Sequence, residues 1–383
     1  MINRISSFAV ILAAVVLAGC GGYASRANFE PEAVADPQWS AQSDPDSIAT
    51  WALRKCRWGS LAARRNCVER GLGAVIRTAG VGQGMAALDR IAARDAEMLR
   101  ESHGLAHGLG IAAYRGPETV AEDFAACPPT QVSGCYHGMI QGYFLDLLRR
   151  QGDVTTAQMN ALCEPHRSNT LLYFQCTHGL GHGVMAMYAN HVPASLEKCD
   201  EVTEAHARDS CYGGVFMESI IAATHPEHTA HSHAEVAESG KAGEHGEHGE
   251  GEHAGHGGGE HAGHEGAQAG GEHAGHGADH GARATAQREP WKALDRDDPL
   301  YPCTVVADKY LFQCYLIQTA AILALNNGDI PETAEACSRA PAKYAPVCYR
   351  SLGRDLVAFA DRQPANRVAG QIEGDQLLCA ASP

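Results

Sequence analysis

The sequence predicts an all-α protein of about seven stacked helical hairpins, each about 34 residues long. Three observations favour this fold class. Strand-like alternation of apolar and polar residues is absent. Four similar stretches begin at positions 101, 135, 176 and 211, and twelve cysteines fall into close pairs at matching points of the repeat. A period of this length is typical of two-helix units that bury their apolar faces against their neighbours.

The chain begins with a segment typical of secretion. Residues 8–18 form an apolar core too short to span a bilayer. The Leu-Ala-Gly-Cys sequence that ends at Cys20 resembles the bacterial lipobox, which implies a signal peptide over residues 1–19 and lipidation of Cys20. A plain secretory signal is the alternative. Gly21 follows in place of aspartate, which by the same resemblance implies the periplasmic face of the outer membrane. Residues 20–45 are polar without a period and are predicted to be a tether.

The net charge of −15 is concentrated in one segment. Eleven of the acidic residues lie in residues 225–280, where Lys241 is the only lysine or arginine. The sequence has no cluster of lysine and arginine residues that could bind a phosphate backbone, so a nucleic-acid partner is not expected. The expected partners are a membrane, through the lipid anchor, and a protein on the surface of the repeats.

The cysteine spacing predicts one disulfide in most units, because disulfides are the default in an oxidising compartment. The unit that begins at Glu101 lacks both cysteines, as expected if the two members of a pair bond to each other. The predicted pairs are Cys56–Cys67, Cys127–Cys135, Cys163–Cys176, Cys199–Cys211, Cys303–Cys314 and Cys337–Cys348.

The period and the cysteines resemble tetratricopeptide-like repeats, most of all the secreted bacterial branch in which each hairpin is tied by its own disulfide. CYHGMIQGYFLDLLRRQGDV, which begins at Cys135, and CYRSLGRDL, which begins at Cys348, carry the resemblance. It rests on spacing, over most of residues 46–383. It implies an α-solenoid, or an α/α toroid if seven hairpins complete a ring.

Residues 225–290 interrupt the hairpins and are predicted to be a disordered insertion. They consist mainly of His, Gly, Glu and Ala, and EHAGH occurs three times. Such a segment cannot bury enough apolar surface to fold. Repeats 1–5 are therefore expected over residues 46–224. Repeats 6 and 7 are expected over residues 291–383, with a partial eighth unit that contains the unpaired Cys379.

Metal-binding side chains recur at the second and sixth positions after the start of each repeated stretch. On a helix, positions four apart lie on one face, and stacking brings equivalent faces of neighbouring units together. Imidazole suits Zn, Cu and Ni, and also Fe, so the expected cofactor is a divalent transition metal. The predicted ligands are His103, His107, His137, His178 and His182, with Gln141, Met217 and Glu218 as supporting or additional ligands.

Three other interpretations of these histidines stay open. They could be packing devices, with Gly104, Gly138 and Gly179 allowing close helix approach. They could bind haem non-covalently, since no CxxCH motif for covalent attachment occurs. Finally, a metal with an open coordination position could activate water, with Glu218 as the catalytic base.

The insertion supplies a second candidate metal site. Many imidazoles on an acidic tether favour multidentate, unselective binding of Zn, Ni or Cu, and a tolerated low-complexity expansion is the alternative. Bound imidazoles must be neutral, so affinity should fall below about pH 6.5. The predicted loop ligands are His245, His248, His253, His256, His261, His264, His273 and His276.

These features together predict a lipid-anchored periplasmic protein that sequesters, senses or delivers a transition metal. A helical-repeat scaffold of the cell envelope is the alternative, because helical solenoids commonly bind proteins. A metal-dependent envelope enzyme is the third interpretation. Stability that is independent of His178 and His182 would favour the scaffold, whereas a pocket at the histidine patch would favour the enzyme.

Overall fold

The computed structural model describes residues 37–242 and 291–362, and these residues form helices and no β-strand. The predicted all-α class is therefore confirmed. The predicted signal peptide with Cys20, most of the tether, the loop ligands from His245 to His276, and Cys379 lie outside the described residues.

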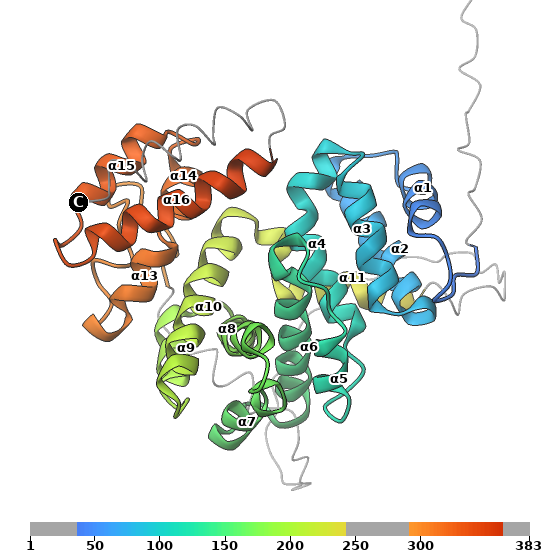
Figure 1. Cartoon of the computed structure of the whole chain (residues 1–383), viewed down its shortest axis with the longest axis horizontal. Helices are drawn as coiled ribbons and strands as arrows, with labels where there is room; N and C mark the ends of the chain where they lie inside the picture. The colour runs from blue at the N-terminus through green and yellow to red at the C-terminus, as the bar shows by residue number, and fades with distance from the viewer. Residues whose placement is uncertain (1–36, 243–290, 363–383) are drawn as a thin grey trace, which may run out of the picture. The chain divides into compact units, whose positions relative to one another are not determined.

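Long and short helices follow one another along the chain (Figure 1). The N-terminal helices are α1 (Pro45–Lys55), α2 (Leu61–Ala79), α3 (Val81–Ala92) and α4 (Ala96–Ala113). Next come α5 (Val120–Ala125), η1 (Gln131–Ser133), α6 (Gly134–Gln151), α7 (Thr156–Ala161), η2 (Glu164–His166), α8 (Thr170–Met187), α9 (Val192–Cys199) and α10 (Ala205–Thr224). The last are η3 (Pro226–His228), α11 (Ala230–Ala242), η5 (Asp308–Tyr310), α13 (Leu311–Ile317), α14 (Thr319–Leu325), α15 (Ile330–Ser338) and α16 (Ala345–Arg362).

Local sequence explains where several helices begin. Asp44, Asp95 and Asn169 accept hydrogen bonds from backbone N–H groups in the first turns of α1, α4 and α8. Thr155 and Gln158 form a capping box at the start of α7. These side chains satisfy N–H groups that have no partner inside the helix, so they set the start of α4 and α8, which carry four of the predicted ligands.

Six disulfides tie the helices together, and each joins cysteines 8 to 13 residues apart in sequence. They are Cys56–Cys67, Cys127–Cys135, Cys163–Cys176, Cys199–Cys211, Cys303–Cys314 and Cys337–Cys348, which are the pairs expected from the spacing. They indicate an oxidising compartment. Within the described part of the chain, no helix has the length and apolar character that crossing a bilayer requires.

Four long helices form a row in the middle of the molecule. Helix α6 lies between α4 and α8, and α8 lies between α6 and α10 (Figure 1). Every residue of α6 from Gly134 to Leu147 is buried, and so is every residue of α8 from Gln175 to Met187. A helix that is buried on all sides is usually apolar, unless its polar side chains bind other groups inside the protein. The polar groups on these two helices therefore need partners inside the protein.

One predicted boundary is wrong, because residues 225–242, which were expected to be disordered, are helical. Residues 225–242 contain η3 and α11, and α11 packs against α2, α4 and α6. His228, Ala230 and His233 are each at most 3% exposed. This segment shares its His-rich composition with residues 243–280, but two of its histidines have buried acidic partners on α2 and α4.

Candidate metal centre

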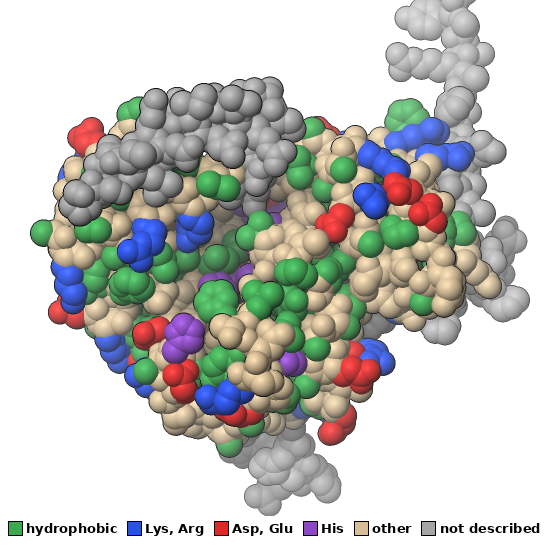
Figure 2. All heavy atoms as spheres, in the orientation of Figure 1, with side chains coloured by type: hydrophobic (Ala, Val, Ile, Leu, Met, Phe, Trp, Pro, Cys, Tyr) green, Lys and Arg blue, Asp and Glu red, His purple; other side chains and the backbone are tan. Residues whose placement is uncertain are grey.

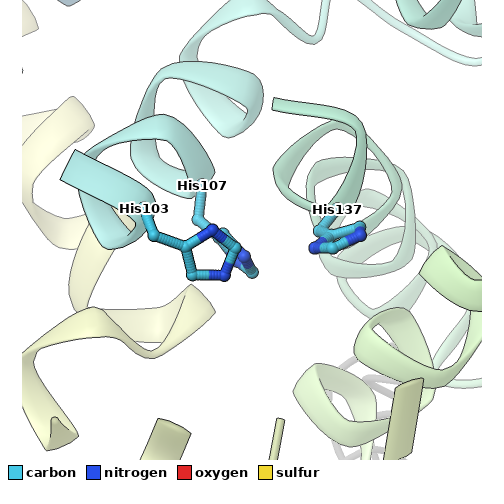
Figure 3. A group of neighbouring side chains, drawn as sticks. All are labelled: His103, His107 and His137. Carbon is cyan, nitrogen blue, oxygen red and sulfur yellow. The ribbon is translucent and has the colours of Figure 1, made fainter. Parts of the chain in front are cut away.

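Five histidines from three neighbouring helices meet in the core. His103 and His107 project from α4, His137 from α6, and His178 and His182 from α8. Ring centroids lie 5.2 Å apart for His107 and His137, and 5.1 Å apart for His178 and His182. Figure 3 shows the α4 and α6 members pointing into the same space. The structure thus brings together all five histidines that the repeat spacing singles out.

In three of these imidazoles, one ring nitrogen faces a side-chain oxygen. His107 Nδ1 donates to Gln141 Oε1 at 3.0 Å. His182 Nδ1 donates to Glu218 Oε2 at 2.7 Å. His137 Nε2 donates to Gln175 Oε1 at 3.3 Å. An oxygen partner fixes the proton on that nitrogen, orients the ring and makes the other nitrogen a basic lone-pair donor.

The other two imidazoles use backbone carbonyls in the same way. His103 Nδ1 donates to the carbonyl oxygen of Gln131 at 2.9 Å. The ring of His178 hydrogen-bonds to the backbone of Ser210. All five rings are therefore held by a hydrogen bond from one nitrogen. This arrangement is usual for imidazoles that bind metal through the second nitrogen.

The remaining nitrogens of three rings are buried without a hydrogen-bond partner among the described residues. They are Nε2 of His107, Nδ1 of His137 and Nε2 of His182. A buried polar atom without a partner costs about 1–3 kcal/mol, so native proteins rarely leave several together. Metal binding through these lone pairs would remove that cost. Each of the three histidines belongs to at least one group of side chains with metal-ligand spacing, and the residues present therefore fit a metal.

The candidate ligand atoms fall into overlapping sets. Within each set they all lie within 4.8 Å of one another. Nitrogen ligands of one zinc ion are at most about 4 Å apart, so small side-chain shifts would let each set hold one ion. The sets in this cluster are His103, His107 and His137; His137, His178 and His182; and His107, His182 and Glu218.

Burial keeps this cluster neutral in the absence of metal. Desolvation holds the pKa values of His107, His137 and His182 well below the usual 6.5, and neighbouring imidazoles lower them further. Desolvation lowers the pKa of His178 to about 4 and raises that of Glu218 to about 8. Neutral imidazoles are the form that binds metal, so few protons compete with a metal at neutral pH.

Glycines let the histidine-bearing helices cross backbone to backbone. A Cβ atom at Gly138 of α6 would overlap the carbonyl oxygen of His107 on α4. A Cβ atom at Gly214 of α10 would overlap the carbonyl oxygen of His178 on α8. The glycines bring the helices close enough for the imidazole rings to meet. Close helix packing and the histidine cluster therefore occur together.

A cavity of about 550 Å³ reaches one edge of the cluster. His103 and His107 line it together with residues of α10, α14 and α16. Figure 2 shows histidine side chains within a hollow that has hydrophobic side chains on its walls. Cavities of 300–1,000 Å³ are typical of small-molecule sites. The histidine cluster is thus reachable from outside on the α4 side.

A second set of histidines packs against α4 next to the cavity. His228 Nε2 donates to Glu101 Oε2 at 2.8 Å, and His233 Nδ1 donates to Glu69 Oε1 at 2.9 Å. Glu101, Glu227 and His228 also have metal-ligand spacing. However, the guanidinium of Arg65 lies 3.7 Å from Glu101 and 3.5 Å from Glu227. A cationic side chain already neutralises these carboxylates, so this set is a clasp that holds η3 and α11 on the core.

The supporting residues expected from the sequence have different roles. Gln141 and Glu218 each hold a ring nitrogen of the cluster, through His107 and His182. Met217 lines the cavity. Glu218 is 1% exposed and is not part of the cavity lining, so the structure does not place it where a base would meet a ligand in the cavity.

The repeat pattern does not indicate several residues of the site. Gln175 directly precedes Cys176 and therefore lies outside the second and sixth positions that the pattern marks. The carbonyl groups of Gln131 and Ser210 carry no side-chain signal at all. Glu69 and His233 are 164 residues apart and their pairing has no local pattern.

Comparison of the chain with protein-family models, with curated proteins and with solved structures finds no match in any of the three.

Proposed function

We propose that this protein is a periplasmic, lipid-anchored transition-metal-binding protein that sequesters, senses or delivers metal. One observation carries the proposal: three buried imidazole nitrogens without partners, on rings already fixed by an oxygen at the other nitrogen. His228 and His233 also have one buried ring nitrogen without a partner. At the centre, however, three such rings lie together, with centroids 4.4 to 5.3 Å apart, as the ligands of a metal ion must.

The donor set limits which metals fit. All twelve cysteines of the described residues are in disulfides, so thiolates are not available. Imidazoles with one carboxylate suit Zn, Cu, Ni and Fe, whereas Mg and Ca prefer all-oxygen sites. The six disulfides support an oxidising compartment, and the lipobox at Cys20 would place the protein on the periplasmic face of the outer membrane.

The architecture that we propose is a stack of about seven hairpins that position the centre. Successive helix pairs such as α5–α6, α7–α8 and α9–α10, each with its disulfide, support it. The acidic His-rich residues 243–290 would collect metal from solution, since many imidazoles in one segment favour multidentate, unselective binding.

Competition titration with a chromophoric chelator tests this function. We expect two classes of sites for Zn or Cu, one tight and buried, and one weak and multiple. His107→Ala/His182→Ala should abolish the tight class and leave the weak class. Replacing the eight loop histidines with serine should do the reverse. A protein that retains the tight class after the core double substitution would contradict the assignment of the site.

The cavity beside His103 and His107 favours a second candidate function, a metal-dependent enzyme. A metal that keeps a coordination position open to the cavity would lower the pKa of bound water and polarise a substrate. Metal-dependent hydrolysis of activated esters, absent in His103→Ala and restored by adding metal only to the unmodified protein, would support this candidate. Tight metal binding with no turnover would leave sequestration, sensing or delivery.

A further inference from the structure

The cavity next to the candidate metal centre is built from three helix faces. Each face consists of residues at positions i, i+3, i+4 and i+7, which lie along one side of a helix. Helix α4 contributes Arg100, His103, Gly104 and His107. Helix α10 contributes Met217, Ile220, Ile221 and Thr224. Helix α14 contributes Ala320, Leu323 and Ala324, and Asn327 follows the end of this helix. Most of the lining therefore comes from regular helix faces.

These walls differ in chemistry. The α4 wall presents a guanidinium and two imidazoles, whereas the α10 and α14 walls present half-buried aliphatic side chains such as Ile221 and Leu323. Covering an apolar side chain that is partly exposed in a cavity removes it from water, which favours ligand binding. The cavity thus suits a ligand with one polar end and an apolar body.

The charges of the lining favour a single negative charge on that polar end. Arg354 donates to Asp355 Oδ1 from Nε at 2.7 Å and to the carbonyl oxygen of Leu316 from Nη1 at 2.7 Å, so its charge is largely matched. Arg100 is exposed and has no carboxylate within ion-pair distance among residues 37–242 and 291–362. It lies one helical turn from His103, so a bound metal would add positive charge at the same end.

We propose that this cavity binds an apolar monocarboxylic acid, with the carboxylate at the Arg100 and His103 end and the apolar body between α10 and α14. Guanidinium recognises carboxylate through two parallel hydrogen bonds, and a transition metal accepts a carboxylate oxygen as a further ligand. The assignment rests on the proposed metal-binding function for the metal contact, but the arginine and the apolar walls do not depend on metal.

Calorimetric titration of the full-length, zinc-loaded protein with decanoate tests the assignment. We expect saturable binding of one decanoate per chain. Decanol has the same body without the charge and should bind at least tenfold more weakly. Acetate has the charge without the body and should give no measurable binding. Equal affinity for decanol and decanoate would overturn the carboxylate assignment.

Two substitutions place the ligand in this cavity. Ala320→Trp adds a large ring to the apolar lining and should weaken decanoate binding at least tenfold. Ala223→Trp is the matched control, because Ala223 is exposed on α10 and is not part of the lining. Arg100→Met keeps the apolar stem, removes the charge and should lower affinity for decanoate but not for decanol. Unchanged decanoate binding in Ala320→Trp, with an unaltered melting temperature, would show that the ligand binds elsewhere.

Elemental analysis of the same samples separates the two proposals. If zinc is absent but decanoate binds and Ala320→Trp blocks it, the metal function fails and the ligand site is supported. If zinc is bound at the centre but decanoate does not bind, the ligand site is overturned and the metal function is unaffected. Cobalt substitution adds a direct check, because decanoate at the metal should shift the visible bands of bound Co²⁺.

Discussion

His182 Nδ1 donates a 2.7 Å hydrogen bond to Glu218 Oε2, with both side chains at most 1% exposed, while Nε2 of the same ring has no partner among the described residues. This is the carboxylate–histidine pairing that orients metal ligands and raises their basicity. A positive ion at Nε2 would also favour the charged form of Glu218, whose pKa burial raises to about 8. Metal binding at His182 is therefore expected to be coupled to ionisation of Glu218.

Glu218→Gln should lower metal affinity by about 10–100-fold without unfolding the protein, because the amide oxygen still accepts from His182 but carries no charge. Chelator competition measures this change. Glu335→Gln on α15 is the matched control, since Glu335 is exposed, and it should leave affinity unchanged. Equal affinity in both variants would show that the carboxylate plays no part in binding.

The metal-free protein should lose stability as pH falls below 6.5. Burial lowers the pKa of His178 to about 4, so between these values the unfolded chain takes up a proton that the folded chain does not. The unfolded state is thereby favoured, by up to roughly 3 kcal/mol for this residue. His107, His137 and His182 act in the same direction. Urea unfolding at pH 7 and pH 5 should show the loss, and His178→Gln should reduce it.

Glu218 should have the opposite pH dependence. Its pKa is raised in the folded state, so the folded chain holds a proton between about pH 4.5 and pH 8 that the unfolded chain has released. Its contribution to stability is fully present below pH 4.5 and is lost as pH rises through 8. Urea unfolding of the metal-free protein at pH 7 and pH 9 should show this decline, and Glu218→Gln should remove it. A decline that persists in the variant would mean that another group titrates.

Gly138→Ala should destabilise the protein by about 1–3 kcal/mol and weaken metal binding, because the added methyl group would overlap the carbonyl oxygen of His107 and push α4 from α6. Gly82→Ala is the control, since nothing lies within 4 Å of a Cβ atom there. It should be neutral or stabilise by up to about 1 kcal/mol through helix propensity. Thermal unfolding and chelator competition measure both effects.

Gly104→Ala should release η3 and α11 from the core, because a Cβ atom there would overlap the ring of His228. We expect faster hydrogen exchange of backbone amides in residues 225–242. In Gly73→Ala the new Cβ atom would lie 3.6 Å from that of Ala112, an ordinary contact, so exchange of this segment should not change. Unaltered exchange in both variants would mean that the clasp does not hold the segment.

The repeat spacing was sufficient to predict that the five histidines lie close together, because stacked units place equivalent positions side by side. Composition was misleading at residues 225–242. Their sequence resembles the rest of the insertion, and their order depends on Glu69 and Glu101, which are distant in the chain. The cavity could not be predicted, because its shape depends on how α14 and α16 lie against α10, and no local pattern encodes that relationship.

X-ray absorption at the zinc edge tests the central claim most directly. The sample is the protein with its eight loop histidines replaced by serine, loaded with one equivalent of zinc and dialysed. We predict retained zinc with at least three imidazole nitrogens at about 2.0–2.1 Å and no sulfur, and loss of this signal in His107→Ala/His182→Ala. A folded protein that retains no zinc, or zinc bound without imidazole, would contradict the account.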